Sequence, residues 1–126
     1  VIFYAPIDVI LDEHNVVQPD IVFVAKSNSK ILQKKGIVGN PDLVVEIISP
    51  STIQRDRHEK KELYQSFGVP EYWIIDPANK SIEVLCLENG RYSLFSFAVQ
   101  AGKVKYKVIA GFEIEISQVM AIEYPE

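Results

Sequence analysis

Two acidic residues in apolar, strand-like segments are the residues of this sequence best able to do chemistry. Glu46 lies within the run Leu43–Ile48, and Asp20 begins the run Asp20–Val24. A buried carboxylate is rare unless it is paired or binds a metal, because taking a charge out of water is costly. Two such carboxylates close together repel and need a cation, for which a divalent metal is the natural partner. In the alternative interpretation, both residues lie at strand ends in contact with water.

Asp42 shares a strand face with Glu46 but is not expected to share a metal with it. Four residues of extended chain span about 13 Å, which is too far for one coordination shell. Asp20, on an adjacent strand, is the carboxylate that can meet Glu46.

A lysine on the predicted helix is a candidate partner for these carboxylates. At about 100° per residue, Lys60 lies near the centre of an apolar helix face. The residues of that face are Ile53, Leu63, Tyr64 and Phe67. A lysine in this position either extends to water or pairs with a buried carboxylate. The helix alone favours the first outcome, whereas the two strand carboxylates favour the second.

The order of the expected strands and helix along the chain predicts an α/β or α+β fold with one mixed sheet, which must position these residues. A helix is expected over about 52–67, because Ser51 and Gln54 have capping-box spacing and Gly68 suits the C-terminal cap. The polar segment 26–40 is expected to be a loop or a short helix. Strands are predicted at 3–11, 16–24, 43–49 and 71–76, followed by an antiparallel C-terminal meander over 82–87, 92–98, 103–109 and 112–116.

Composition excludes several classes of protein. The chain has 126 residues, which predicts a single domain over 1–126. One cysteine and two histidines rule out an intramolecular disulfide framework and a zinc site of nitrogen and sulfur ligands. Cys86, within an apolar strand, is expected to be a buried thiol. The sequence has no apolar run of about 18 residues and no signal-peptide pattern, so we expect a cytoplasmic protein without a membrane span.

Three segments resemble a known family. They are Pro19-Asp20, PDLVVEIISPST at 41–52 and RDRHEKKELYQSFGVPEYWIIDP at 55–77. Over about residues 5–98 the chain resembles an uncharacterised restriction-endonuclease-like family of the PD-(D/E)xK nuclease superfamily. The resemblance implies a core of helix, three strands, helix and strand, together with metal-dependent hydrolysis of phosphodiester bonds. No segment matches the first helix of that core, so the domain is expected to be N-terminally truncated.

The resemblance also implies a site. Asp20 and Glu46 match the positions that bind Mg²⁺ or a similar ion such as Mn²⁺, and the backbone carbonyl of Ile47 matches the position that completes the metal site. Ile48 occupies the usual position of the superfamily's lysine, and the residue that matches the helix lysine used instead is Lys60. The helix-face argument and the resemblance therefore select the same lysine.

The expected mechanism assigns further roles on the helix. Lys60 would orient or deprotonate the attacking water, or neutralise charge that develops on the phosphate. Asp56 and Tyr64, four residues before and after Lys60, could each hold its ammonium in place. Basic residues that could contact flanking phosphates, or simply form a solvated face, are Arg55, Arg57 and Lys61.

The resulting hypothesis is a metal-dependent endonuclease that acts on nucleic acid, with DNA as the expected polymer. Its alternatives are a catalytically inactive binding or assembly module and a small-molecule phosphodiesterase. The net charge is −4, but residues 26–62 contain eight basic and five acidic side chains, against five and twelve elsewhere. This local surplus is compatible with a nucleic-acid substrate. Alternating apolar residues over 104–116 suggest a sheet edge or face and hence a homodimer.

Overall fold

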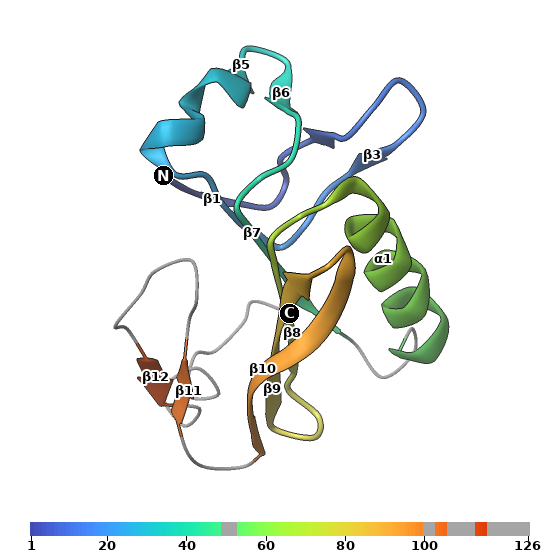
Figure 1. The fold of residues 1–126 in the computed structure, drawn as a ribbon, viewed down its shortest axis with the longest axis vertical. Helices are drawn as coiled ribbons and strands as arrows, with labels where there is room; N and C mark the ends of the chain where they lie inside the picture. The colour runs from blue at the N-terminus through green and yellow to red at the C-terminus, as the bar shows by residue number, and fades with distance from the viewer. Residues whose placement is uncertain (49–52, 100–102, 106–112, 116–126) are drawn as a thin grey trace.

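A six-stranded mixed sheet forms the centre of the fold (Figure 1). The computed structural model describes the backbone of residues 1–48, 53–99, 103–105 and 113–115, and the side chains of residues 1–48 and 58–99. The sheet has the order β1-β4-β7-β8-β9-β10. Its strands are β1 (Ile2–Tyr4), β4 (Ile21–Phe23), β7 (Leu43–Ile47), β8 (Glu71–Asp76), β9 (Ser81–Glu88) and β10 (Arg91–Val99). β7 and β8 are parallel, and the other neighbouring pairs of this sheet are antiparallel.

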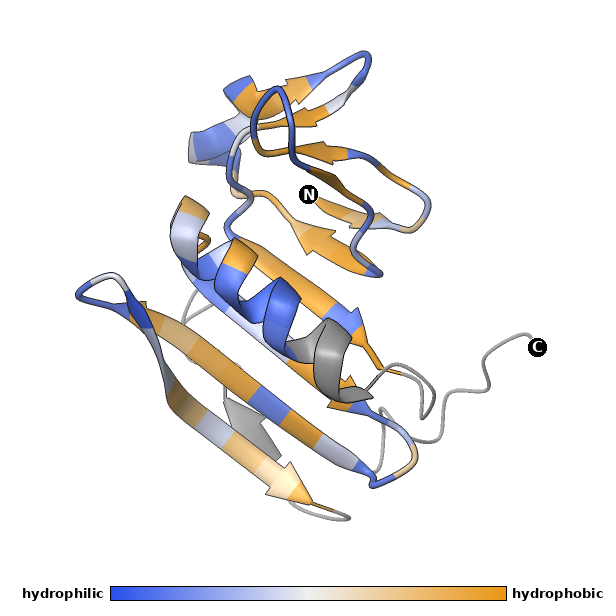
Figure 2. Ribbon diagram, turned by 90° about the vertical axis from the view of Figure 1, so that its right-hand side faces the viewer, coloured by the Kyte–Doolittle hydropathy of each residue, from blue (hydrophilic) through white to orange (hydrophobic). Residues whose placement is uncertain are grey.

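The helix α1 (Ile53–Phe67) connects the two parallel strands and covers one face of the sheet. Parallel neighbours need a crossover of this kind because a tight turn cannot join them. Tyr64 packs on this face against Val44 and Tyr72, and Val45 packs with Trp73 in a second cluster of buried residues. In Figure 2 most of the coloured residues of α1 are hydrophilic, whereas the strands behind the helix are largely hydrophobic. β7 is therefore a central strand that is buried on both faces.

The end of α1 lies where the sequence predicts it. Gly68 has a φ of +80°, and the amide of Val69 donates to the carbonyl of Tyr64 at 3.1 Å. Glycine adopts this left-handed conformation without the clash that a Cβ would cause. The side-chain amide of Asn40 donates to the carbonyl of Phe67, which ties the helix end to the loop before β7.

The N-terminal third differs from its prediction, since each of two expected strands is divided in two. The segment 3–11 contributes β1 and β2 (Val9–Ile10), and the segment 16–24 contributes β3 (Val16–Val17) and β4. Pro6 and Pro19 separate the halves, because proline has no N–H for a sheet hydrogen bond. β2 and β3 belong to a second, four-stranded sheet of order β3-β2-β6-β5, here named the small sheet.

The lysine-rich segment 26–40 also carries more structure than predicted. It forms the 3₁₀ helix η1 (Lys26–Ile31) and a hairpin of β5 (Leu32–Gln33) and β6 (Gly36–Val38). The small sheet packs against β4 through Val9, Ile37 and Val22. This contact fixes the start of β4, where Asp20 lies.

The C-terminal meander is confirmed in part. β9 and β10 form the predicted hairpin around Asn89 and Gly90, both with positive φ. β11 (Lys103–Lys105) and β12 (Glu113–Glu115) pair antiparallel with each other as a separate two-stranded sheet rather than extending the large one. The side chains of 104–116 on which the homodimer hypothesis rests lie outside those described, so the dimer stays a prediction, as does the single domain. Within the described part of the chain, no helix has the length and hydropathy needed to cross a membrane.

A substitution at Gly36 tests the close approach of β6 to the backbone of Asp8. Gly36 has a φ of +140°, and a Cβ added there would lie 2.6 Å from the backbone oxygen of Asp8. Gly90 also has a positive φ, of +80°, but a Cβ there would meet nothing within 4 Å. We expect Gly90→Ala to cost about 1–2 kcal/mol of unfolding free energy from backbone strain alone. Gly36→Ala should cost more, because a backbone atom must also move. Urea denaturation measures both variants, and equal losses would contradict the close approach.

Candidate active site

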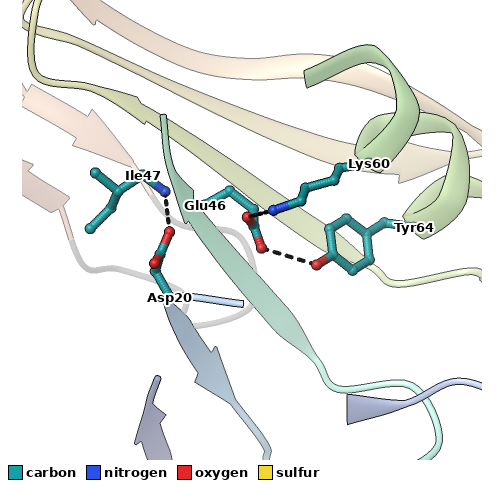
Figure 3. A network of polar contacts seen from close by, with 5 residues as sticks. All are labelled: Asp20, Glu46, Ile47, Lys60 and Tyr64. Atoms are coloured by element: carbon teal, nitrogen blue, oxygen red, sulfur yellow. Dashed lines mark hydrogen bonds and ion pairs between the residues drawn. The ribbon is translucent and has the colours of Figure 1, made fainter. Parts of the chain in front are cut away.

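Glu46 is a buried carboxylate that two side chains of α1 hold. Its side chain lies on the face of β7 that α1 covers, and the residue is only 4% exposed. Lys60 Nζ donates to Glu46 Oε2 at 2.5 Å, and the hydroxyl of Tyr64 donates to Oε1 at 3.1 Å (Figure 3). Residues four apart on a helix face the same way, so both donors reach one carboxylate. The buried pairing predicted for Lys60 is what the structure has.

The electrostatics of Glu46 reflect opposing effects. Burial raises the pKa of the Glu46 carboxyl above its ordinary value, and the ammonium of Lys60 opposes that rise through its hydrogen bond and its charge. The negative charge of Asp20 raises the pKa further. Burial and the neighbouring Glu46 also raise the pKa of Tyr64, so its hydroxyl remains a donor. The site therefore favours a cation beside Glu46.

Asp20 lies beside β7 at the end where Glu46 is found. β4 pairs with β7 in a register that places Ile21 opposite Val45, so Asp20 lies near Glu46. Asp20 Oδ2 accepts a hydrogen bond from the backbone N–H of Ile47 at 2.7 Å (Figure 3). The N–H and C=O of an extended residue point to the same edge of a strand, which turns the Ile47 carbonyl toward the Asp20 side. Among the described residues, no side chain or backbone group donates to Asp20 Oδ1, so this oxygen can serve a cation.

These groups line a cavity of about 160 Å³. Its lining residues are Gln18, Asp20, Glu46, Ile47, Ile48, Lys60 and Tyr72. Sequence reasoning missed Gln18, although a signal was present, since residues two apart in an extended chain share a face and Gln18 precedes Asp20 by two. The cavity thus combines two carboxylates, an ammonium and an amide.

The donor set suits a hard divalent cation. Across residues 1–48 and 58–99, no cluster of three or more His, Cys, Asp or Glu side chains is present. Mg²⁺ is usually held by one or two protein carboxylates, with water and substrate phosphate oxygens as its other ligands. Asp20, Glu46 and the Ile47 carbonyl match that pattern, and the histidines and Cys86 play no part in it. Cys86 is a buried free thiol, as predicted.

The other predicted residues lie at the far end of β7 or on α1. Asp42 lies at the opposite end of β7, where its Oδ2 accepts from the backbone N–H of Ala25 at 2.7 Å, so its exclusion from the site is confirmed. Tyr64 was expected to hold the ammonium of Lys60, but its hydroxyl donates to Glu46, the carboxylate that Lys60 also binds. Lys61 is partly buried on α1. The side chains of Arg55, Asp56 and Arg57 lie outside those described.

The Lys60–Glu46 pair predicts a pH-dependent loss of stability in Lys60→Met. Breaking a fully buried pair costs about 3–5 kcal/mol, and we expect about 1–3 kcal/mol because the lysine keeps some contact with solvent. A carboxyl with a raised pKa in the folded state stabilises the fold at low pH and loses that contribution as the pH rises through the folded pKa. Without Lys60 that pKa rises further, so the loss should be largest near neutral pH and smaller near pH ~4.

Urea denaturation at the two pH values measures this effect. Lys61→Met, at the next position of the same helix, is the control and should change stability by about 0.5 kcal/mol or less. Equal losses in the two variants, or a Lys60→Met loss that does not depend on pH, would contradict a buried ion pair.

Comparison with known proteins identifies the family and the fold of this chain. Residues 1–117 match the Uma2 family model, described as "Putative restriction endonuclease". The fold is similar to the crystal structure of a putative nuclease belonging to DUF820 from Anabaena variabilis, with a TM-score of 0.69 and 20% identity, over 95% of this chain and 67% of that one. No curated protein sequence matches the chain. The fold is therefore the α+β, restriction-endonuclease-like fold that the sequence predicts, and the chain belongs to the Uma2 family.

Proposed function

We propose that this chain is a metal-dependent nuclease that hydrolyses phosphodiester bonds in nucleic acid, with DNA as the expected polymer. The observation that carries the proposal is the convergence of Asp20, Glu46 and Lys60 on one small cavity. Membership of a family described as "Putative restriction endonuclease" supports the same class of reaction. In a pure binding module, Lys60 would only neutralise the buried Glu46 carboxylate, and Asp20 would only accept the hydrogen bond from Ile47.

Each side chain has a distinct role in the proposed reaction. Asp20, Glu46 and the Ile47 carbonyl would hold Mg²⁺ or Mn²⁺. A divalent cation in such a site supplies Lewis acidity to a phosphate oxygen and lowers the pKa of bound water. Lys60 lines the same cavity, so its ammonium can orient the attacking water or neutralise charge that develops on the phosphate. Tyr64 keeps the Glu46 carboxylate in one orientation.

The charged groups of the cavity favour contact with the phosphate backbone of a substrate rather than with its bases. Asp20 and Glu46 can act on a phosphate through a cation, and Lys60 can act on it through its ammonium. Phosphate contacts of this kind position a nucleic acid without reading its sequence. Arg55, Arg57 and Lys61 on α1 are the proposed contacts for flanking phosphates.

A cleavage assay tests the proposal. Supercoiled plasmid, linear duplex, single-stranded DNA and RNA are incubated with Mg²⁺ or Mn²⁺, and EDTA should abolish the activity of the wild type. We expect Asp20→Asn, Glu46→Gln and Lys60→Ala each to lower the rate by about 10²-fold or more, since each removes a charge from the reacting centre. Asp42→Asn removes a carboxylate from the far end of the same strand and should keep the activity of the wild type.

Two results would overturn the proposal. One is a wild type that cuts none of the four polymers, and the other is site variants that cut as fast as Asp42→Asn. Hydrolysis of bis(p-nitrophenyl) phosphate without cleavage of any polymer would replace the nuclease with a small-molecule phosphodiesterase. That reaction would use the same cation site.

A further inference from the structure

We infer that Gln18 is an additional oxygen donor to the cation in this cavity, and that Asp8 orients it. The inference rests on the proposed function, since it concerns the same cation. It adds a neutral amide to the two carboxylates, and it gives the small sheet a part in the site.

The placement of Gln18 follows from the chain that carries Asp20. Gln18, Pro19 and Asp20 lead into β4, and Gln18 and Asp20 both line the cavity. Pro19, which is buried, restricts the backbone between them, because its ring fixes φ. The two side chains are therefore presented to the cavity from one short, constrained segment.

The hydrogen bond to Asp8 determines which end of the Gln18 amide is left for a ligand. Gln18 Nε2 donates to Asp8 Oδ1 at 2.7 Å. An ionised carboxylate only accepts hydrogen bonds, so the nitrogen must face Asp8 and the oxygen must turn away from it. Gln18 can then offer Oε1, an acceptor, to the cavity that it lines. Amide oxygens are hard ligands of the kind that Mg²⁺, Mn²⁺ and Ca²⁺ accept.

Asp8 is itself held by the small sheet. Its backbone carbonyl accepts from the N–H of Ile37 at 2.9 Å, and Gly36 lies against the same oxygen. This segment between β1 and β2 therefore has a defined position relative to β6. Residues that orient a metal ligand often contribute almost as much to metal affinity as the ligand itself. A chain of contacts thus runs from β6 through Asp8 and Gln18 to the cation site.

Binding of Mn²⁺ without nucleic acid tests the inference, with free Mn²⁺ measured by electron paramagnetic resonance. We expect Gln18→Met, which keeps the length of the side chain but removes its oxygen, to weaken binding by about tenfold. Gln18→Glu should bind at least as tightly as the wild type, because it restores the oxygen and adds a charge. Gln33, an exposed glutamine of β5, is the matched control, and Gln33→Met and Gln33→Glu should stay within about twofold of the wild type.

A double-mutant cycle tests the role of Asp8. Asp8→Ala should weaken Mn²⁺ binding in the wild type and weaken it much less in Gln18→Met, because the orienting effect is then already lost. Equal losses in both backgrounds would show that Asp8 acts through its charge alone and would overturn its orienting role.

The outcomes separate this inference from the proposed function. If Gln18→Met binds Mn²⁺ as tightly as the wild type while Glu46→Gln loses binding, the role of Gln18 is wrong and the cation site stands. If Glu46→Gln and the wild type bind Mn²⁺ equally, the cation site itself is wrong and both proposals fail. Thermal unfolding of Gln18→Met should match that of the wild type, since Gln18 is exposed, so a loss of binding would not reflect a loss of folding.

Discussion

The burial of the Glu46 carboxylate on the central strand is the constraint that organises this structure. A charge taken out of water must find donors or become neutral, and here Lys60 and Tyr64 are those donors. Both lie on α1, so the helix must cross this face of the sheet in the one rotation that directs them at β7. The ion pair and the apolar packing therefore favour the same position of the helix. Tyr64 also packs against Val44 and Tyr72 in the interface between α1 and the sheet.

The topology explains why the second carboxylate arrives at the same place. β7 and β8 are parallel with α1 between them, whereas β4 runs antiparallel to β7. The start of β4 consequently meets the end of β7, and Asp20 reaches the N–H of Ile47. Proline at position 19 ends the preceding strand just before this point, which frees the chain to change sheets. The segment that carries Gln18 and Asp20 thus connects β3 of one sheet to β4 of the other, and both side chains line the cavity.

The basic residues of this chain are concentrated in one segment, which the net charge of −4 does not reveal. A chain of net charge −4 is a poor general binder of nucleic acid, yet its surplus of basic residues lies in 26–62, which includes α1. A cavity with two carboxylates would repel a phosphate unless a cation and the nearby lysine offset them. In the proposed reaction, association with a polyanion at this site would therefore depend on the cation, and substrate binding would be coupled to catalysis.

Much of the fold and of the candidate site could be predicted from the sequence, because some residues can occupy only a few kinds of environment. Glu46 within an apolar run and Gly68 at a helix end are found in the environments that the sequence indicates, and Lys60 takes one of its two expected environments, the pairing with a buried carboxylate. The division of the N-terminal strands and the hairpin within 26–40 were not predictable in this way. Gln18 shares a strand face with Asp20 in the sequence pattern, but only the folded chain places it beside Asp8 and in the lining of the cavity. By itself, the sequence determined the types of element and the residues that cannot be buried alone, since these follow from local periodicity and the cost of desolvation. The tertiary structure decided which of those residues meet, since strand register and sheet exchange depend on contacts between segments far apart in the chain.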